Sequence, residues 1–143
     1  MNYPEQLRLL SIFHYVAGGL HILFGSIGLI HLTIGILFIL DPSAMASKGQ
    51  SAPPFWFGYL FAAIGGGFVF FGWSLGLLTI YSGRCIARRK RRTFSLVMGG
   101  INCAMMPFGT ALGVFTIFLL TKPESAGFYK LPPLPPPDRP VAM

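Results

Sequence analysis

Charged residues divide this chain into long apolar stretches separated by short polar segments. No Asp, Glu, Lys or Arg occurs in residues 9–40, 51–83 or 93–121. Each stretch exceeds the roughly 20 residues with which a helix crosses the hydrocarbon core of a bilayer. The pattern therefore predicts an all-α integral membrane protein with three transmembrane helices.

The first apolar stretch is too long for one straight span. At about 1.5 Å per residue, residues 9–40 would make a helix of roughly 48 Å, whereas the core measures about 30 Å. The helix would begin as an amphipathic segment, with Glu5, Arg8, Ser11 and Tyr15 along one side and Leu9, Leu10, Ile12, Phe13 and Val16 on the other. We expect an interfacial start that bends or slides into a span over residues 15–40. Asp41-Pro42 should end it, because the residue before a proline is disfavoured in the α region.

The second and third stretches carry different local signals. The second opens with Phe55, Trp56 and Tyr59, which are typical of the aromatic belt at a membrane surface. The third contains Pro107, which lacks a backbone N–H and kinks a helix. One kinked, tilted span over residues 93–121 is the prediction. A re-entrant hairpin turning at Pro107-Phe108-Gly109 is the alternative.

Composition agrees with a membrane protein. Of 143 residues, 53% are hydrophobic and 10% are charged, against about 25% charged in soluble domains. The first apolar stretch is longer than the core of a signal peptide and lacks a basic segment before it, so we expect it to stay in the mature protein. Residues 1–121 should form one transmembrane domain. Residues 122–143 are rich in proline and predict an extended or disordered tail.

Six of the 11 Lys and Arg residues lie in one short segment, residues 84–92. They are Arg84, Arg88, Arg89, Lys90, Arg91 and Arg92. The positive-inside rule places this loop in the cytoplasm, and three spans then place the N-terminus inside and the tail outside. A hairpin in the third stretch would move the tail to the cytoplasm. We expect these cations to contact anionic lipid headgroups, at about 1 kcal/mol each. Nucleic acid is excluded as a partner, because the run is tied at both ends to membrane helices without a recognition helix or stacking platform.

Glycines recur at spacings of three, four or seven residues within the stretches, which aligns them along one helix face. The candidate packing residues are Gly18, Gly25, Gly28 and Gly35 in the first, Gly65, Gly72 and Gly76 in the second, and Gly109 and Gly113 in the third. Small faces let membrane helices approach closely, which matters because hydrophobic exclusion adds little inside lipid. The pattern does not distinguish packing within one chain from packing between copies.

Polar residues inside the predicted spans are the candidates for specific contacts, because burying them in lipid is costly. They are His14, His21, His31, Asn102 and Thr116. We expect a hydrogen bond between His21 and Asn102. The histidines could instead serve a haem, a metal or a proton relay, but all three lie on one helix, so a bis-His site would need a second copy or another protein.

The sequence lacks the residues that common catalytic sites require. No carboxylate, lysine or arginine lies inside a predicted span, and no nucleotide-binding or hydrolase motif occurs. Cys85 and Cys103 should lie at different depths and remain unpaired. We therefore expect no enzyme activity and no cofactor.

Three segments resemble small bacterial membrane proteins of uncharacterised function. They are LRLLSIFHYVAGGL at residues 7–20, SGRCIARRKRRTFSLVMGGINC at residues 82–103 and MPFGTALGVFTIFLL at residues 106–120. Those proteins carry an Arg-rich loop followed by a Pro-x-Gly-Thr-x-Leu-Gly segment in the last span. The resemblance implies a multi-pass protein of the bacterial plasma membrane, and it implies no activity or site residues.

These observations favour a protein that acts by helix packing, as an accessory or assembly subunit of a membrane complex or as a homo-oligomer. Two other hypotheses stay open. The first is a small oligomeric channel or carrier lined by His21, His31, Asn102 and Thr116. The second is a haem-binding redox subunit.

Overall fold

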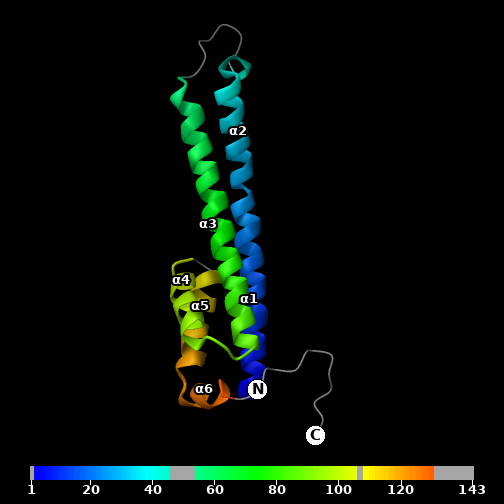
Figure 1. The fold of residues 1–143 in the computed structure, drawn as a ribbon, viewed down its shortest axis with the longest axis vertical. Coiled ribbons are helices and arrows are strands. Elements are labelled where there is room, and N and C mark those ends of the chain that lie inside the picture. Colours follow the sequence, from blue (N-terminus) through cyan, green and yellow to red (C-terminus); the bar gives the residue numbers. More distant parts are fainter. Residues whose placement is uncertain (1, 46–53, 106–107, 131–143) are drawn as a thin grey trace. The chain divides into compact units, whose positions relative to one another are not determined.

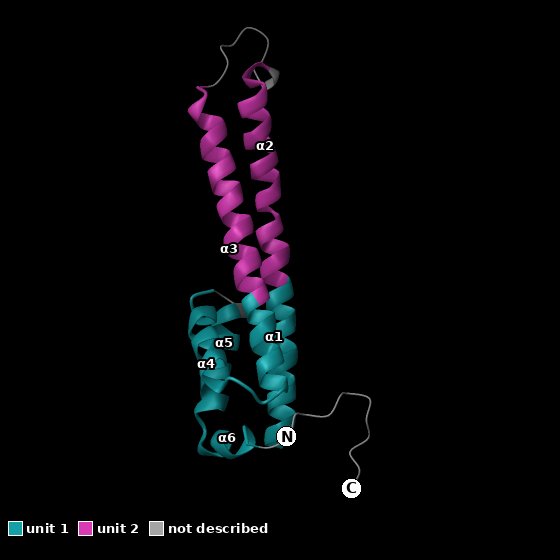
Figure 2. Cartoon of the chain, viewed as in Figure 1, with its two compact units in different colours: residues 1–19, 78–143 teal, residues 20–77 magenta. Residues whose placement is uncertain are grey.

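The computed structural model describes residues 2–45, 54–105 and 108–130, in which every regular element is a helix (Figure 1). The elements are α1 (Tyr3–Ser26), α2 (Gly28–Leu40), the 3-10 turn η1 (Pro42–Met45), α3 (Trp56–Ala87), α4 (Arg92–Cys103), α5 (Phe108–Thr121) and α6 (Pro123–Phe128). The chain forms two compact units (Figure 2). Unit 1 contains residues 1–19 and 78–143, and unit 2 contains residues 20–77.

Two helical stretches are long and apolar enough to cross a membrane, Tyr3–Leu40 with 38 residues and Trp56–Ala87 with 32. The first combines α1 and α2, which meet at Ile27, where the backbone tightens into i to i+3 hydrogen bonds of 3.1 Å on either side of that residue. α2 ends at Leu40, directly before Asp41-Pro42, which confirms the predicted helix end. α1 is one unbroken helix from Tyr3 to Ser26, so the helix is not interrupted near Tyr15.

The start of α1 leaves part of its apolar side exposed. Leu10, Ser11 and His14 are buried in unit 1, whereas Ile12 and Phe13 are about half exposed, at 48% and 49%. The buried face therefore mixes polar and apolar side chains, and the more uniformly apolar face is left uncovered. A soluble protein would bury this apolar face, so the arrangement suits a helix whose outer side meets lipid.

In unit 2, glycines bring the helix backbones into direct contact. A Cβ atom built on Gly25 would lie 2.9 Å from Gly72 Cα, and one on Gly28 would lie 2.6 Å from Gly65 O. A Cβ on Gly35 would lie 2.8 Å from Gly58 O. These separations leave no room for a methyl group, so α3 packs against the end of α1 and against α2 through a series of small residues within one chain.

The third apolar stretch is not a single span. α4 and α5 pack against each other as an antiparallel pair, in which Gly99 faces Thr116 and Gly109 faces Asn102. The prediction of one kinked span over residues 93–121 is therefore wrong, and the stretch folds as the alternative, a helical hairpin. Two helices of 12 and 14 residues replace it, each shorter than the roughly 20 residues that cross a bilayer.

The hairpin turns earlier than the sequence suggested. Phe108 and Gly109 already belong to α5, so the reversal lies between Cys103 and Phe108, and Pro107 lies outside the described residues. Thr110 Oγ1 donates to the carbonyl of Cys103 at 2.8 Å, which caps the end of α4.

The hairpin brings the end of α5 back beside the start of α4 and the start of α1. Tyr3 Oη donates to Leu119 O at 2.8 Å, and the Tyr3 ring meets the Phe128 ring edge to face at 4.8 Å. Arg92 Nε donates to Leu120 O at 2.9 Å. The start of α1, the basic segment and the end of α5 therefore lie together.

Candidate functional site: the basic turn and the buried polar layer

The basic segment forms a tight turn of four residues between α3 and α4. Arg89 N donates to Ile86 O at 3.0 Å and Lys90 N donates to Cys85 O at 2.9 Å, the pair of bonds that defines a Schellman C-cap. Arg89 has the positive φ of 52° that this motif requires, and Arg91 also has a φ of 52°. Glycine is the usual residue in this conformation, so surrounding contacts must hold these two arginines in place.

Two of the six cations attach the turn to α5 and α6. The guanidinium of Arg92 donates to Leu120 O, and Arg89 Cζ lies 5.1 Å from the centre of the Phe128 ring. Partial burial lowers the pKa of Arg89 from its ordinary value. Burial, aided by the nearby Tyr3 hydroxyl, raises the pKa of Tyr129 to about 12. These contacts connect the turn to α5 and α6.

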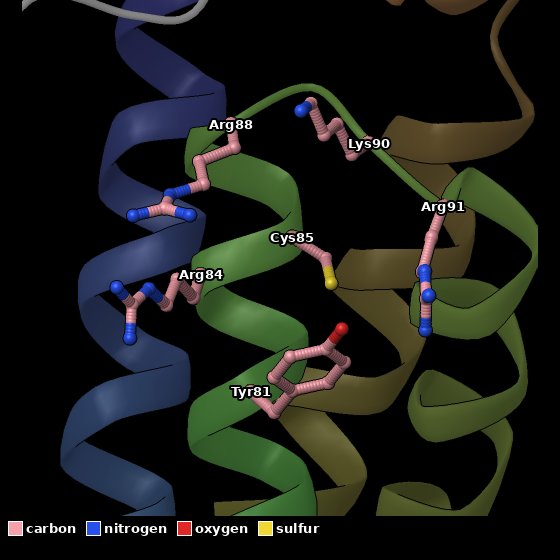
Figure 3. Close-up of a pocket in the computed structure, with 6 residues that line it drawn as sticks. All are labelled: Tyr81, Arg84, Cys85, Arg88, Lys90 and Arg91. Carbon is pink, nitrogen blue, oxygen red and sulfur yellow. The ribbon is translucent and has the colours of Figure 1, made fainter.

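The other four cations are exposed and line a pocket of about 160 Å³. Arg84 lies in the last turn of α3, Arg88 directly follows the helix end, and Lys90 and Arg91 lie further along the turn (Figure 3). Tyr81 and Cys85 lie between these two pairs, and Arg91 Cζ is 6.0 Å from the Tyr81 ring centre. No acidic side chain lines the pocket. The structure thus separates six cations that are equivalent in the sequence into a packing pair and a pocket group.

A second group of chemically interesting side chains lies inside unit 1. We call it the polar layer, and its members are Ser11, His14, Thr79, Ser82, Ser95, Asn102 and Thr116, each at most 3% exposed. They come from α1, α3, α4 and α5. Of these residues, sequence reasoning had identified His14, Asn102 and Thr116 as candidates. It did not single out Thr79, Ser82 or Ser95, although Thr79 follows Gly76 by three positions and precedes Gly83 by four, on the small-residue face of α3.

His14 is held on α1 by its own helix and by α3. His14 Nδ1 lies 2.9 Å from Leu10 O, so Nδ1 carries the proton and donates to this carbonyl. The His14 Cβ packs on Gly83, where an added Cβ would lie 2.8 Å away, and Ser11 Oγ donates to Gly83 O at 2.9 Å. His14 Nε2 has no hydrogen-bond partner among the described residues, which leaves a buried acceptor.

Asn102 joins α4 to α3. Thr79 Oγ1 donates to Asn102 Oδ1 at 3.3 Å, whereas Asn102 Nδ2 and Ser82 Oγ have no partner in the described part of the chain. Thr116 Oγ1 donates to Leu112 O within its own helix, at 2.6 Å. Buried polar atoms without partners cost about 1–3 kcal/mol each, so native proteins keep few of them. The polar layer therefore carries a stability cost.

The other two histidines belong to unit 2. His31 is exposed and stacks on Phe61 at 5.9 Å between ring centres. His21 is half-buried, and its Nδ1 has no partner among the described residues. Asn102 belongs to unit 1, so the expected hydrogen bond between His21 and Asn102 would join the two units, and it stays a prediction.

The remaining candidates are placed as follows. Gly18 and Gly76 are buried, and Gly113 of α5 packs against Gly99 and Cys103 of α4. Cys85 and Cys103 are both free thiols. Across residues 2–45, 54–105 and 108–130, no three His, Cys, Asp or Glu side chains cluster closely enough to hold a metal ion.

The contact between Thr79 and Asn102 can be measured by a double-mutant cycle. We expect Thr79→Val and Asn102→Leu to be non-additive, with a coupling free energy of about 0.6 kcal/mol and at most about 1.7, the range for hydrogen bonds between membrane helices. The free energy of unfolding would be followed by circular dichroism during denaturation in mixed micelles. Thr33→Val is the control, because Thr33 Oγ1 bonds only Leu29 O of its own helix. Additive effects at 79 and 102 would contradict the contact.

Comparison with models of protein families, with curated proteins and with solved structures finds no match for this chain.

Proposed function

We propose that this chain is a small integral membrane protein that acts by helix packing, as an accessory or assembly subunit of a membrane complex or as a homo-oligomer. One observation carries the proposal. In the most apolar windows of the two long helical stretches, only 17% and 11% of the residues are buried within the chain. Surfaces of this kind need lipid or a protein partner to cover them.

The apolar surface is built from large side chains rather than glycines. The most exposed residues of the two long stretches include Leu23, Ile30, Phe68, Phe70 and Phe71, each at least 60% exposed. The closest glycine contacts already pair helices within one chain. A partner helix would therefore meet the bulky faces, by van der Waals packing of side chains, and would leave the internal glycine contacts intact.

We propose a topology with two spans, Tyr3–Leu40 and Trp56–Ala87, in a bacterial plasma membrane. The basic turn faces the cytoplasm by the positive-inside rule. Tyr3 and Arg92 both bond to the end of α5, which supports a cytoplasmic N-terminus and a cytoplasmic end of α5. The pair of α4 and α5 then enters the membrane as a re-entrant hairpin, for which the exposed Val97, Val114 and Phe118 provide an apolar outer face.

The mass of the intact particle tests the packing proposal. Purified in a mild detergent from its native membrane, the 15.6 kDa chain is expected to appear in a particle of at least twice that mass, containing copies of itself or a fixed set of other subunits. Native mass spectrometry would identify the components. The same sample in a harsh detergent is the control, and its particle should dissociate. A single chain bound only to lipid in the mild detergent would contradict the proposal.

A further inference from the structure

The geometry points to the pocket beside the basic turn as a binding site for a phosphomonoester group. Its lining residues are Tyr81, Arg84, Cys85, Arg88, Lys90 and Arg91 (Figure 3). The inference deepens the proposed membrane function, because it rests on this turn lying at the membrane surface and assigns a ligand class to it. Contact with lipid charge in general would need only a basic surface, whereas this pocket selects a chemical group.

Charge and size select the class of ligand. Four cations and no acid line a volume of about 160 Å³, well below the roughly 300–1,000 Å³ of pockets for drug-sized molecules. A phosphate group fits this description, since it is small and offers oxygens on several sides to guanidinium forks. A phosphomonoester carries about −1.5 to −2 charges at pH 7, with a second pKa near 6. A phosphodiester carries one charge, so four cations favour the monoester.

The turn orders the backbone that carries Lys90 and Arg91. Arg91 is held at a positive φ and lies near the Tyr81 ring, while Lys90 N is bonded to Cys85 O. The neighbouring Arg89 and Arg92 attach the same backbone to Phe128 and Leu120. A ligand therefore meets a backbone that is already ordered, which lowers the entropy cost of binding.

Arg84 and Arg88 supply the other side of the site. Arg84 lies in the last turn of α3 and Arg88 directly follows the helix end, where Arg88 N donates to Arg84 O at 3.0 Å. Both side chains are exposed and lie next to each other (Figure 3). Without a ligand, four cations with no acid among them repel one another. In Figure 3 the guanidinium groups of Arg84 and Arg88 point away from Arg91, and both side chains are exposed, so they can turn toward a bound dianion. A dianion in the pocket reduces the repulsion and gains charge-assisted hydrogen bonds. The Tyr81 hydroxyl adds a neutral donor.

The test uses the full chain in nanodiscs of neutral lipid. Binding would be compared between phosphatidic acid, a phosphomonoester, and phosphatidylglycerol, a phosphodiester, at equal mole fraction. The wild type is expected to bind phosphatidic acid at least about fivefold more tightly. Arg88→Gln and Arg91→Gln are each expected to lose about fivefold in affinity, the effect of one cation near the surface. Arg88→Lys should retain most of the binding.

Arg8→Gln is the matched control, because Arg8 is an exposed arginine of unit 1 outside the pocket, and the substitution changes the net charge equally. Its affinity should change less than about twofold. Equal losses for Arg8→Gln and Arg88→Gln, or equal affinity for the two lipids, would overturn the site. Circular dichroism of each variant shows that it is folded.

Inorganic phosphate distinguishes the two sources of the ligand. If phosphate binds the detergent-solubilised protein and Arg88→Gln weakens that binding, the site takes soluble phosphomonoesters. If phosphate does not compete with phosphatidic acid, the site takes the lipid headgroup. Carbonate extraction tests the membrane proposal separately. Release of the chain from membranes would reject the proposal that it is an integral membrane protein. The phosphate-binding site would still be decided by the effects of the pocket variants on binding.

Discussion

Gly65→Ala is expected to destabilise the protein by about 1–3 kcal/mol, although alanine is normally the better helix former. A methyl group on Gly65 would overlap Leu32 N and would lie 2.6 Å from Gly28 O. Both are backbone atoms that cannot rotate away, so α2 and α3 must separate along this contact. Denaturation in mixed micelles, followed by circular dichroism, measures the free energy of unfolding.

Gly67→Ala is the control on the same helix. A Cβ on Gly67 would meet nothing within 4 Å, so only the change in helix propensity remains. That change is neutral to stabilising, by up to about 1 kcal/mol in soluble helices. The two substitutions should thus have opposite signs. Equal effects at 65 and 67 would show that the glycine contact between α2 and α3 is not formed.

A reporter fused after Lys130 is expected to lie in the cytoplasm. Since α4 and α5 form a hairpin, the end of α5 returns to the basic turn, and Tyr3 and Arg92 both bond to it. A fluorescent protein at this point should fluoresce, and a periplasmic alkaline phosphatase should be inactive. The expected difference between the two reporters is close to all or none.

A truncated fusion after Met45, at the end of η1, provides the reference for the outer side. There the phosphatase should be active and the fluorescent protein dark. If the fusions after Lys130 behave like those after Met45, the third apolar stretch crosses the membrane and the two-span topology is wrong.

The helices that span residues 3–40 and 56–87 follow from the sequence almost entirely. Their apolar length and the stop at Asp41-Pro42 are local properties of the chain, and α2 does end at Leu40. The fold of residues 93–121 does not follow from the sequence in this way. Pro107 weakens the helix equally for a kinked span and for a hairpin, and the choice depends on the fit of Gly109 and Gly113 against α4. A fit between helices is not encoded in any one segment.

For the basic segment too, the sequence predicts the position of the charges but not the contacts of their side chains. By itself, the sequence determined that six cations gather between two apolar stretches, because charge is a property of each residue. Only the tertiary structure decided that Arg89 and Arg92 pack on α5 and α6 while four others line a pocket. Leu120 lies within reach of Arg92 because the hairpin brings the end of α5 back. The roles of equivalent charges are therefore set by their neighbours in space, which the order of residues does not specify.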